Sequence, residues 1–167
     1  MTVNNTDWIV PRAQGYDTNR SLRKEIMSGL ENVMFNPYVA GNAEFKPLES
    51  DFASKLGMKY AVAVQSATAG LILALRACDV GPGDEVITVG NSDISTTAAI
   101  SIIGATIVLV DILESDYTID GSQVASAVTD RTKAILPVDL YGHPSDCIAL
   151  RKVADEHGLK IIEDAAL

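Results

Sequence analysis

The stretch from residue 85 to residue 111 reads EVITVGNSDISTTAAISIIGATIVLVD. Its two short β-branched runs, Val86–Val89 and Thr106–Val110, are typical of buried strands, and the intervening segment Ser95–Ile103 is typical of a helix. A strand, a helix and a second strand at this spacing predict a βαβ crossover, which joins parallel strands of one sheet.

The same alternation of short apolar runs and helix-like segments continues on both sides of this stretch. Further buried strands are expected at Ala61–Val64, Ala134–Val138 and Lys160–Glu163. Further helices are expected at Thr68–Ala77, Ser122–Val128 and Asp146–His157. The connection Gly81-Pro82-Gly83-Asp84 has proline and glycine where a type II turn favours them. The pattern predicts an α/β fold, a mostly parallel sheet with helices on both faces that binds ligands at the carboxyl ends of its strands.

The chain before residue 60 has a different texture. Residues 1–20 predict an irregular arm, and residues 35–42 predict a connector. A helix is expected from Ser21 onward, with apolar residues at helical spacing: Leu22, Ile26, Leu30 and Val33. A second helix is expected to carry Leu48, Phe52 and Leu56 on one face and to end at Gly57.

Composition limits the classes of partner. Of the 167 residues, 47% are apolar and 21% are charged, which is ordinary for a globular protein, and the net charge is −9. That charge argues against a nucleic acid or an anionic membrane as partner, because both would repel the chain. No apolar run approaches the roughly 18 residues of a membrane span, and no signal peptide is recognisable, so the cytoplasm is the expected compartment. Cys78 and Cys147 fit no metal or redox spacing and are expected to be reduced, buried thiols.

The first candidate site is the stretch from Gln65 to Gly70, which lies between an expected strand and an apolar helix. Small residues there would let an anion approach the free N–H groups of the first helical turn, and the helix dipole would favour it. Ser66 or Thr68 could add a hydroxyl to the same anion. The alternative interpretation is that Ser66 only caps the helix, which needs no ligand.

The second candidate is the acidic pair Glu163-Asp164, which follows the last expected strand. A carboxylate beside a ring nitrogen would favour the protonated form of the ring, because an opposite charge stabilises the cation. A helix cap or a surface ion pair is the alternative for this pair.

The third candidate is the polar stretch from Asn91 to Thr97, after the strand that ends at Val89. Its side chains could contact a ligand, although capping of the next helix by Ser92 or Asp93 is the preferred interpretation from local sequence. His143 and His157 stand in an expected turn and at an expected helix end, and neither is assigned a catalytic role.

An ordered series of short motifs runs along most of the chain. The motifs are YAVAVQSATAG from Tyr60, GPGDEVI from Gly81, GA from Gly104, TKAI from Thr132, LYGHP from Leu140 and GLKIIEDAA from Gly158. From about Phe35 to the last residue, this series resembles the DegT/DnrJ/EryC1/StrS family of sugar aminotransferases, which depend on pyridoxal 5′-phosphate (PLP).

The resemblance implies a domain organisation and a cofactor site. It implies the aspartate-aminotransferase fold of type I, with an N-terminal arm and helix over residues 1–34. Residues 35–167 would then form an incomplete PLP-binding large domain. The cofactor-binding residues that it implies are Ala67, Thr68 and Ala69 at the phosphate and Asp164 at the pyridine nitrogen.

Two positions depart from the family pattern. Asp93 stands where many members have an aromatic residue stacked on the cofactor ring, and it is retained as a cofactor-binding candidate. A carboxylate cannot stack, so the ring would be covered by Ile94 or in another way. Leu167 stands where many members have a glutamine that contacts the ring edge, and leucine offers no hydrogen bond.

The resemblance also implies parts that the chain lacks. The family's Schiff-base lysine follows the aspartate motif by some tens of residues, so no catalytic residue is assigned here. None of the lysines stands in such a place: Lys24, Lys46, Lys55, Lys59, Lys133, Lys152 and Lys160. The strands that would pair with Ala61–Val64 and the small C-terminal domain are also absent.

These missing parts affect the expected stability of the chain. Unpaired buried backbone groups cost roughly 1–3 kcal/mol each. The isolated polypeptide is therefore expected to be unstable or to aggregate through its strand edges. Cooperative thermal unfolding of a soluble monomer would contradict this expectation.

For the intact parent, the resemblance implies amino transfer from an amino acid, with glutamate as the expected donor. The acceptor would be a keto group of a nucleotide-linked deoxysugar, and the protein would be a homodimer. The chain as given is expected to be inactive. Other readings are a PLP-dependent sugar dehydratase with histidine in place of the lysine, and a truncated or regulatory product without turnover. A nicotinamide-binding domain fits the βαβ pattern but lacks the glycine fingerprint.

Overall fold

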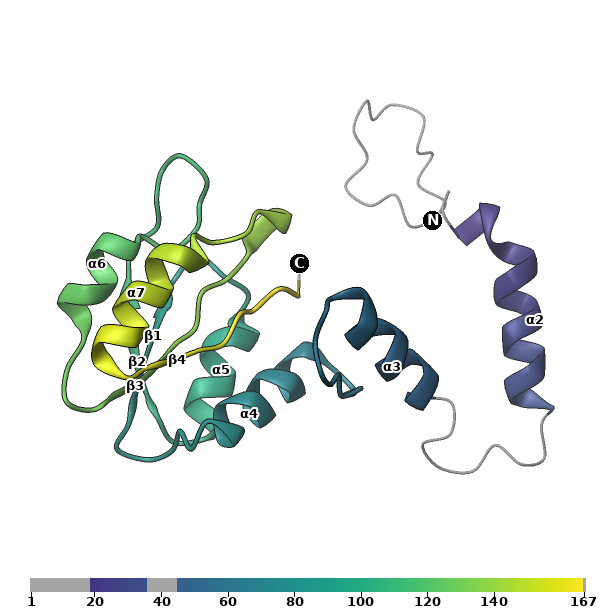
Figure 1. The fold of residues 1–167 in the computed structure, drawn as a ribbon, viewed down its shortest axis with the longest axis horizontal. Helices are drawn as coiled ribbons and strands as arrows, with labels where there is room; N and C mark the ends of the chain where they lie inside the picture. The colour runs from purple at the N-terminus through teal and green to yellow at the C-terminus, as the bar shows by residue number, and fades with distance from the viewer. Residues whose placement is uncertain (1–18, 36–44, 167) are drawn as a thin grey trace, which may run out of the picture. The chain divides into compact units, whose positions relative to one another are not determined.

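The structure is a computed structural model that describes residues 19–35 and 45–166 (Figure 1). The chain divides into two compact units, residues 1–63 and residues 64–167. Of the predicted arm over residues 1–20, residues 1–18 lie outside the described residues, as do most of the predicted connector and Leu167, and residues 19–20 are helical rather than irregular. The predicted domain boundary after residue 34 stays a prediction.

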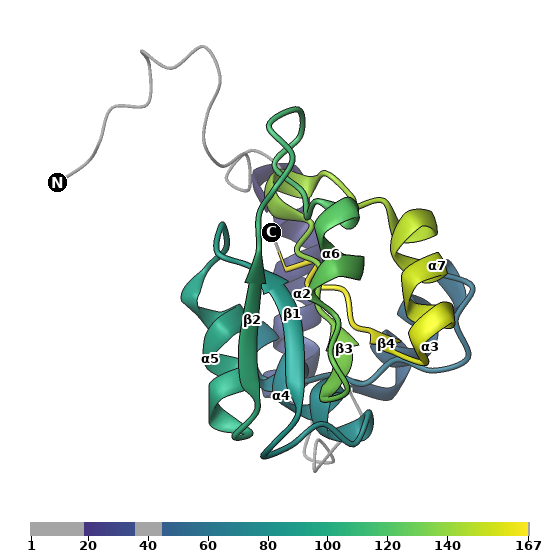
Figure 2. The same cartoon turned by 90° about the vertical axis from the view of Figure 1, so that its left-hand side faces the viewer.

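The unit that contains residues 64–167 is built around a four-stranded sheet. Its strands are β1 (Glu85–Val89), β2 (Thr106–Val110), β3 (Thr132–Ile135) and β4 (Lys160–Ile161), in the spatial order β2-β1-β3-β4. Every neighbouring pair runs parallel, so all the carboxyl ends lie at one edge of the sheet (Figure 2).

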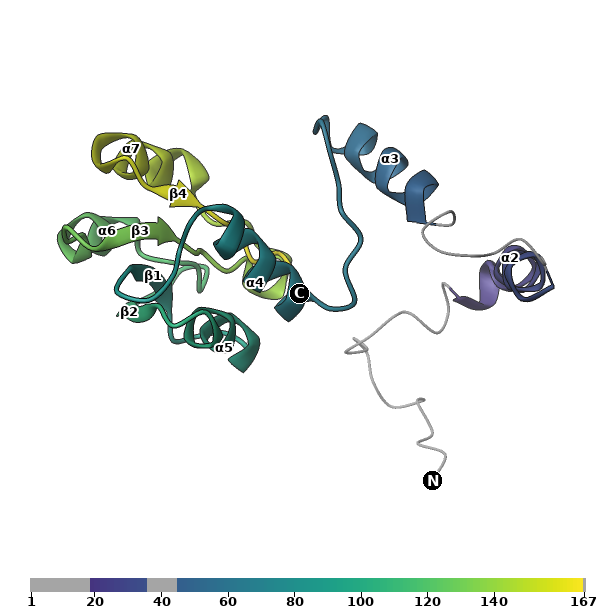
Figure 3. The same ribbon diagram turned by 90° about the horizontal axis from the view of Figure 1, so that it is seen from below.

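Helices cover both faces of this sheet. Helices α4 (Ala67–Ala77) and α5 (Ile94–Ile102) lie on one face, and α6 (Gly121–Ala127) and α7 (Cys147–His157) lie on the other (Figure 3). Each of α5, α6 and α7 connects two parallel strands, as a crossover helix must. The prediction of an α/β fold with a parallel sheet between two helical layers is confirmed.

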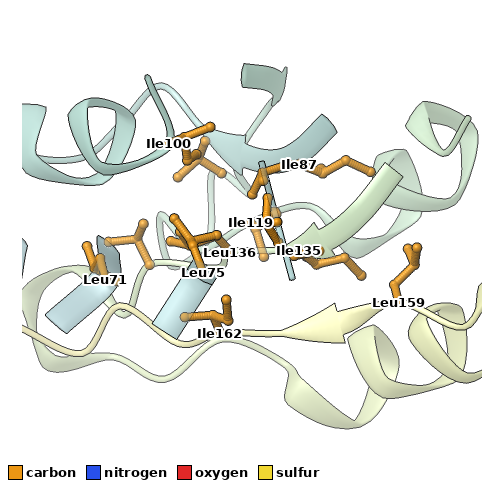
Figure 4. Packing of buried hydrophobic residues seen from close by; sticks show 14 of the residues in the cluster. Leu71, Leu75, Ile87, Ile100, Ile119, Ile135, Leu136, Leu159 and Ile162 are labelled. Carbon is orange, nitrogen blue, oxygen red and sulfur yellow. The ribbon is translucent and has the colours of Figure 1, made fainter. Parts of the chain in front are cut away.

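The core lies between the sheet and its helices. All five residues of β1 are buried, because this strand has a neighbour on each side and helices on both faces. Leu71 and Leu75 of α4 pack in the same buried cluster as Leu136 and Ile162, which follow β3 and β4 (Figure 4). Each such side chain contributes roughly 1.5–3 kcal/mol by leaving water, so α4 is held firmly against the ends of these strands.

Polar side chains fix where the helices begin. The residues before α4, α5, α6 and α7 each accept a hydrogen bond from a backbone N–H of the first turn: Ser66, Asp93, Asp120 and Asp146. Such caps stabilise a helix by about 1 kcal/mol each. Helix α7 ends at Gly158, whose φ of 69° is in the left-handed region that glycine adopts without strain.

The predicted strand Ala61–Val64 is wrong. These residues form no strand, and the side chains of Val62 and Val64 are 75% and 42% exposed. The N–H of Ala63 donates to the Glu49 carboxylate at 2.8 Å, a side chain rather than a neighbouring strand. A β-branched run becomes a buried strand only when a partner strand satisfies its backbone, and the described sheet consists of β1 to β4 alone.

Two other strands are shorter than predicted. β3 ends at Ile135 and β4 at Ile161, instead of at Val138 and Glu163. The regular ladder stops there because Pro137 has no N–H to donate. The predicted type II turn is confirmed, since Gly83 has a φ of 94° and the N–H of Asp84 donates to the Gly81 carbonyl at 3.1 Å.

The unit of residues 1–63 contributes the helices α2 (Arg23–Met34) and α3 (Phe45–Lys55). Both predicted helices are therefore present. Their apolar rows are not covered within the described residues, since Leu48, Phe52 and Leu56 are 54–58% exposed. None of the helices in residues 19–35 and 45–166 combines the length and apolar character that a membrane span requires.

Glu85 anchors the amino edge of the sheet at the start of β1. Its side chain is almost fully buried, and its carboxylate accepts hydrogen bonds from the Thr129 hydroxyl at 2.5 Å and from Arg131 Nε at 2.9 Å. These interactions lower the pKa of Glu85, and the bond from Thr129 contributes most.

Replacing Glu85 by glutamine is expected to destabilise the protein in a pH-dependent way. The folded-state pKa of Glu85 is depressed, so its stabilisation is present above the unfolded value near 4.5 and is lost as the pH falls through the folded value. Thermal unfolding should show a gap between wild type and Glu85→Gln at about pH 7 that closes toward about pH 3. The exposed neighbour Asp130 provides the control, because Asp130→Asn should open no such gap. A gap for Glu85→Gln that stays constant with pH would contradict the prediction.

Candidate cofactor site

A pocket of about 310 Å³ lies at the carboxyl edge of the sheet, between the start of α4 and the segment that follows β4. Its walls come from these two segments: Ala67, Gly70, Leu71, Ala74, Ile162, Glu163, Asp164, Ala165 and Ala166. The volume is at the lower end of the ~300–1,000 Å³ that is usual for small-molecule sites. Two sequence candidates that are far apart in the chain, Ala67 and Asp164, therefore line one pocket.

The start of α4 contributes Ala67 to the wall of this pocket and has backbone N–H groups free for an acceptor. The first four N–H groups of a helix have no partner inside it. Ser66 Oγ accepts from the N–H of Ala69 at 3.2 Å, and the Ser66 carbonyl accepts from the N–H of Gly70 at 3.0 Å. Among the described residues, the N–H groups of Ala67 and Thr68 are left without an acceptor. Ser66 is thus a helix cap, as one interpretation predicted, and its capping still leaves two donors for an anion.

Asp164 contributes a carboxylate to the wall of the pocket, and its backbone is held by the neighbouring segment. Its N–H donates to the Pro137 carbonyl at 2.9 Å, and its carbonyl accepts from the N–H of Asp139 at 3.0 Å. Val138 and Asp164 form a parallel bridge, so the pairing of β3 and β4 resumes beyond their regular ends. Asp164 is 7% exposed, which makes it a buried carboxylate on the wall of a pocket.

A buried hydroxyl of α5 contacts this carboxylate. Thr96 is fully buried, and its Oγ1 donates to Asp164 Oδ2 at 2.7 Å. Ser92 Oγ lies 2.7 Å from the same Thr96 oxygen. The local sequence indicates the polar stretch from Asn91 to Thr97 but not Thr96 in particular, because the partner of Thr96 stands 68 positions later.

The other oxygen of Asp164 stays available to the pocket. No donor to Oδ1 is present among the described residues, where every fully buried side-chain polar atom does have a hydrogen-bond partner. Oδ1 is therefore not sealed inside the protein, and Asp164 is one of the residues that line the pocket. The pocket is thus lined by the first residue of α4, by the acidic residues Glu163 and Asp164 and by small apolar residues such as Ala165 and Ala166.

Three sequence candidates are not part of the described lining of this pocket. Thr68 and Ala69 share the first turn of α4 with Ala67. Asp93 is exposed and caps α5, with its Oδ1 accepting from the N–H of Ser95 at 2.9 Å. Bonds from the Ser95 hydroxyl and N–H lower the pKa of Asp93, so it carries a negative charge near neutral pH. The cofactor contact of Asp93 stays a prediction.

Glu163 differs from its neighbour Asp164, because its carboxylate contacts the thiol of Cys147. Cys147 Sγ donates to Glu163 Oε1 at 3.3 Å. Burial, followed by the bond and charge of Glu163, raises the pKa of Cys147 to about 11, so the thiol stays protonated. Both cysteines are free, as predicted, but they are half-buried rather than buried.

A second pocket of about 500 Å³ lies at the ends of β1 and β2, lined by Gly90, Asn91, Leu109, Val110, Asp111 and Ile112. It is larger, but Asp111 Oδ1 is occupied by the N–H of Ile112 at 2.8 Å, and no buried polar side chain lines it within the described residues. The part of the chain that the structure describes also contains no cluster of side chains suited to a metal ion. The pocket between α4 and Asp164 is therefore the better candidate site.

Comparison with known proteins gives a consistent result over most of the chain. The family model for the DegT/DnrJ/EryC1/StrS aminotransferase family matches residues 20–167. The dTDP-3-amino-3,4,6-trideoxy-alpha-D-glucose transaminase of Streptomyces venezuelae is 43% identical over 145 residues. This alignment covers 87% of the chain but only 38% of the relative, so the chain spans about two fifths of the length of that enzyme.

Solved structures resemble the fold closely. S. venezuelae DesV, solved in complex with a ketimine intermediate, has a TM-score of 0.89 and 41% sequence identity, covering 94% of this chain and 42% of DesV. NtdA from Bacillus subtilis, solved with bound cofactor PMP (pyridoxamine 5′-phosphate), has a TM-score of 0.74 and 31% identity. That match covers 93% of this chain and 34% of NtdA.

Proposed function

The chain belongs to the DegT/DnrJ/EryC1/StrS aminotransferase family, and from this premise we propose that the whole protein is a PLP-dependent sugar aminotransferase. It would transfer the amino group of an amino acid, with glutamate as the expected donor, to a keto group of a nucleotide-linked deoxysugar. The donor would leave as a 2-oxo acid. The single observation that carries the proposal is the pocket that unites the N–H groups of α4 with the carboxylate of Asp164.

The residues of this pocket fit PLP. The cofactor has a phosphate on one side of a flat pyridine ring and a ring nitrogen on another, and when bound it supplies an electron sink for the reacting carbon of the amino acid. A phosphate suits free N–H groups at a helix start. A protonated ring nitrogen suits a carboxylate oxygen. Small apolar walls such as Ala165 and Ala166 suit a flat ring.

In this proposal the start of α4 binds the phosphate. The N–H groups of Ala67 and Thr68 would donate to its oxygens, and Thr68, which is in the first turn of α4, would add its hydroxyl. Ala69 would contribute its small side chain, because its N–H is already taken by Ser66. The α4 dipole would add roughly 0.3–1 kcal/mol per negative charge.

Asp164 would hold a proton on the ring nitrogen. Oδ1 would face the nitrogen, and the ionised carboxylate would keep it cationic. The burial of Asp164 strengthens this effect, because a charge pair interacts more strongly where water is excluded. Asp93, beside the same edge, remains a proposed cofactor contact.

The relatives support the reaction class more directly than its details. S. venezuelae DesV was solved with a ketimine intermediate and NtdA with PMP, and the curated S. venezuelae relative is a transaminase named for a dTDP-linked sugar. This chain covers only 34–42% of the length of these relatives. The donor, the sugar, the lysine that would hold PLP and the homodimer are therefore proposals for the whole protein.

Replacing Asp164 by asparagine in the full-length protein is expected to lower kcat for amino transfer by about a hundredfold or more, the scale for loss of one preorganised electrostatic contact. The variant keeps its shape and its backbone pairing but loses its charge. Steady-state kinetics with glutamate and a nucleotide-linked keto sugar measure the effect. Asp155→Asn, which removes the same charge from an exposed position of α7, is the matched control and should leave kcat unchanged. An equal kcat in wild type and Asp164→Asn would remove Asp164 from the proposed role.

Replacing Ala67 by proline is expected to weaken PMP binding by about tenfold while leaving the fold intact. Proline is well tolerated at the first position of a helix, and Ser66 is already extended, with φ of −162° and ψ of 160°, as a residue before proline prefers. The substitution therefore removes one N–H donor and little else. Isothermal titration with PMP gives the affinity, and Ala67→Gly, which retains the N–H, is the control. Unchanged PMP affinity in Ala67→Pro would exclude this amide from the phosphate site.

A further inference from the structure

We infer that Thr96 is a positioning residue for Asp164, with Ser92 acting behind it, an assignment that rests on the function proposed above. The Thr96 hydroxyl would fix Oδ2 of the carboxylate and so direct Oδ1 to the cofactor ring nitrogen. The inference follows from the one buried side-chain contact that the Asp164 carboxylate makes among the described residues.

The geometry assigns a separate task to each oxygen of Asp164. A carboxylate can rotate about its bond to the rest of the side chain, and a single fixed oxygen stops that rotation. Thr96 Oγ1 holds Oδ2 at 2.7 Å from the fully buried side of α5. Oδ1 has no donor among the described residues, so it would be the oxygen left for the ring nitrogen of a ligand in the pocket.

The direction of the hydrogen bonds also follows from the contacts. Thr96 has a single hydroxyl hydrogen, and it donates this hydrogen to Asp164 Oδ2. The contact of 2.7 Å between Ser92 Oγ and Thr96 Oγ1 must therefore use the hydrogen of Ser92. The chain Ser92 to Thr96 to Asp164 runs in one direction, and each bond polarises the next.

The neighbouring residue Thr97 shows that the contact of Thr96 with Asp164 is not the usual one for a threonine in a helix. Threonine in a helix commonly donates to a carbonyl of the preceding turn. Thr97 does so, with its hydroxyl 3.2 Å from the Ile94 carbonyl. Thr96 instead donates its hydroxyl hydrogen to Asp164, in the segment that follows β4. Its hydroxyl therefore contacts the candidate site rather than a carbonyl of its own helix.

Binding of two ligands can distinguish a Thr96 that positions the Asp164 carboxylate from a Thr96 that only supports the fold. PMP carries the ring nitrogen, and its analogue with carbon in place of that nitrogen cannot interact with Asp164 in the same way. Thr96→Val keeps the shape of the side chain and removes the hydroxyl. In the full-length protein it should weaken PMP binding by about tenfold and leave binding of the carbon analogue unchanged, because only the nitrogen contact is lost.

The remaining variants give a graded series. Thr96→Ser should restore PMP affinity to within about twofold of wild type, since it returns the hydroxyl. Ser92→Ala should weaken PMP binding by a smaller factor in the same direction, because it removes only the second bond of the chain. Thr97→Val, the matched control on the same helix, should change neither affinity. Isothermal titration measures all of these values.

The outcomes distinguish this inference from the proposed function. If wild type binds PMP more tightly than the carbon analogue, and Thr96→Val weakens both ligands equally or neither, Thr96 is structural and the inference is overturned. If wild type binds neither ligand, or binds both equally, the proposed cofactor site itself is overturned. Should Thr96→Val fail to fold, Ser92→Ala decides, because Ser92 is only half-buried: a loss confined to PMP supports the inference, and an equal loss or no loss overturns it.

Discussion

The backbone pairing of Asp164 with Pro137 and Asp139 is the constraint on which the candidate site depends. Two main-chain hydrogen bonds hold this residue after the regular end of β4, so its side chain leaves from a fixed point of the carboxyl edge. A site built on paired strands is held more accurately than one on free loops. The cap of Ser66 does the same for the opposite wall, where it sets the first turn of α4.

Local sequence predicts an element well when the element depends on its own residues. The run Thr106–Val110 was predicted residue for residue, and the starts of four helices follow from side chains that cap their own first turn. The segment Ala61–Val64 has the same β-branched texture and yet is not a strand. A run of β-branched residues indicates that a segment could be buried in a sheet. Whether a partner strand is present to bury it cannot be predicted from the residues of that segment alone.

The same distinction explains which parts of the site were found. Ala67 and Asp164 were predictable because each belongs to a short motif at the end of an expected strand. Thr96 was not, because a polar residue on a helix carries no local sign of a partner 68 positions away. Local sequence favoured capping in the stretch from Asn91 to Thr97, and Asp93 does cap α5. The buried contact between Thr96 and Asp164 can be recognised only from the fold, because the two residues are brought together by the sheet.

The acidic anchor at Glu85 and the candidate site lie at opposite edges of the sheet. Along β1, the four steps from Glu85 to Val89 span about 13 Å, beyond the ~7–10 Å at which energetic effects of separate substitutions begin to add independently. The stability contributed by Glu85 and the ligand binding proposed for the candidate site thus depend on opposite ends of the same strands. During evolution, a substitution that changes ligand preference and lowers the stability of the fold can therefore be compensated by stabilising substitutions around Glu85. Such substitutions would not disturb the groups that contact the ligand.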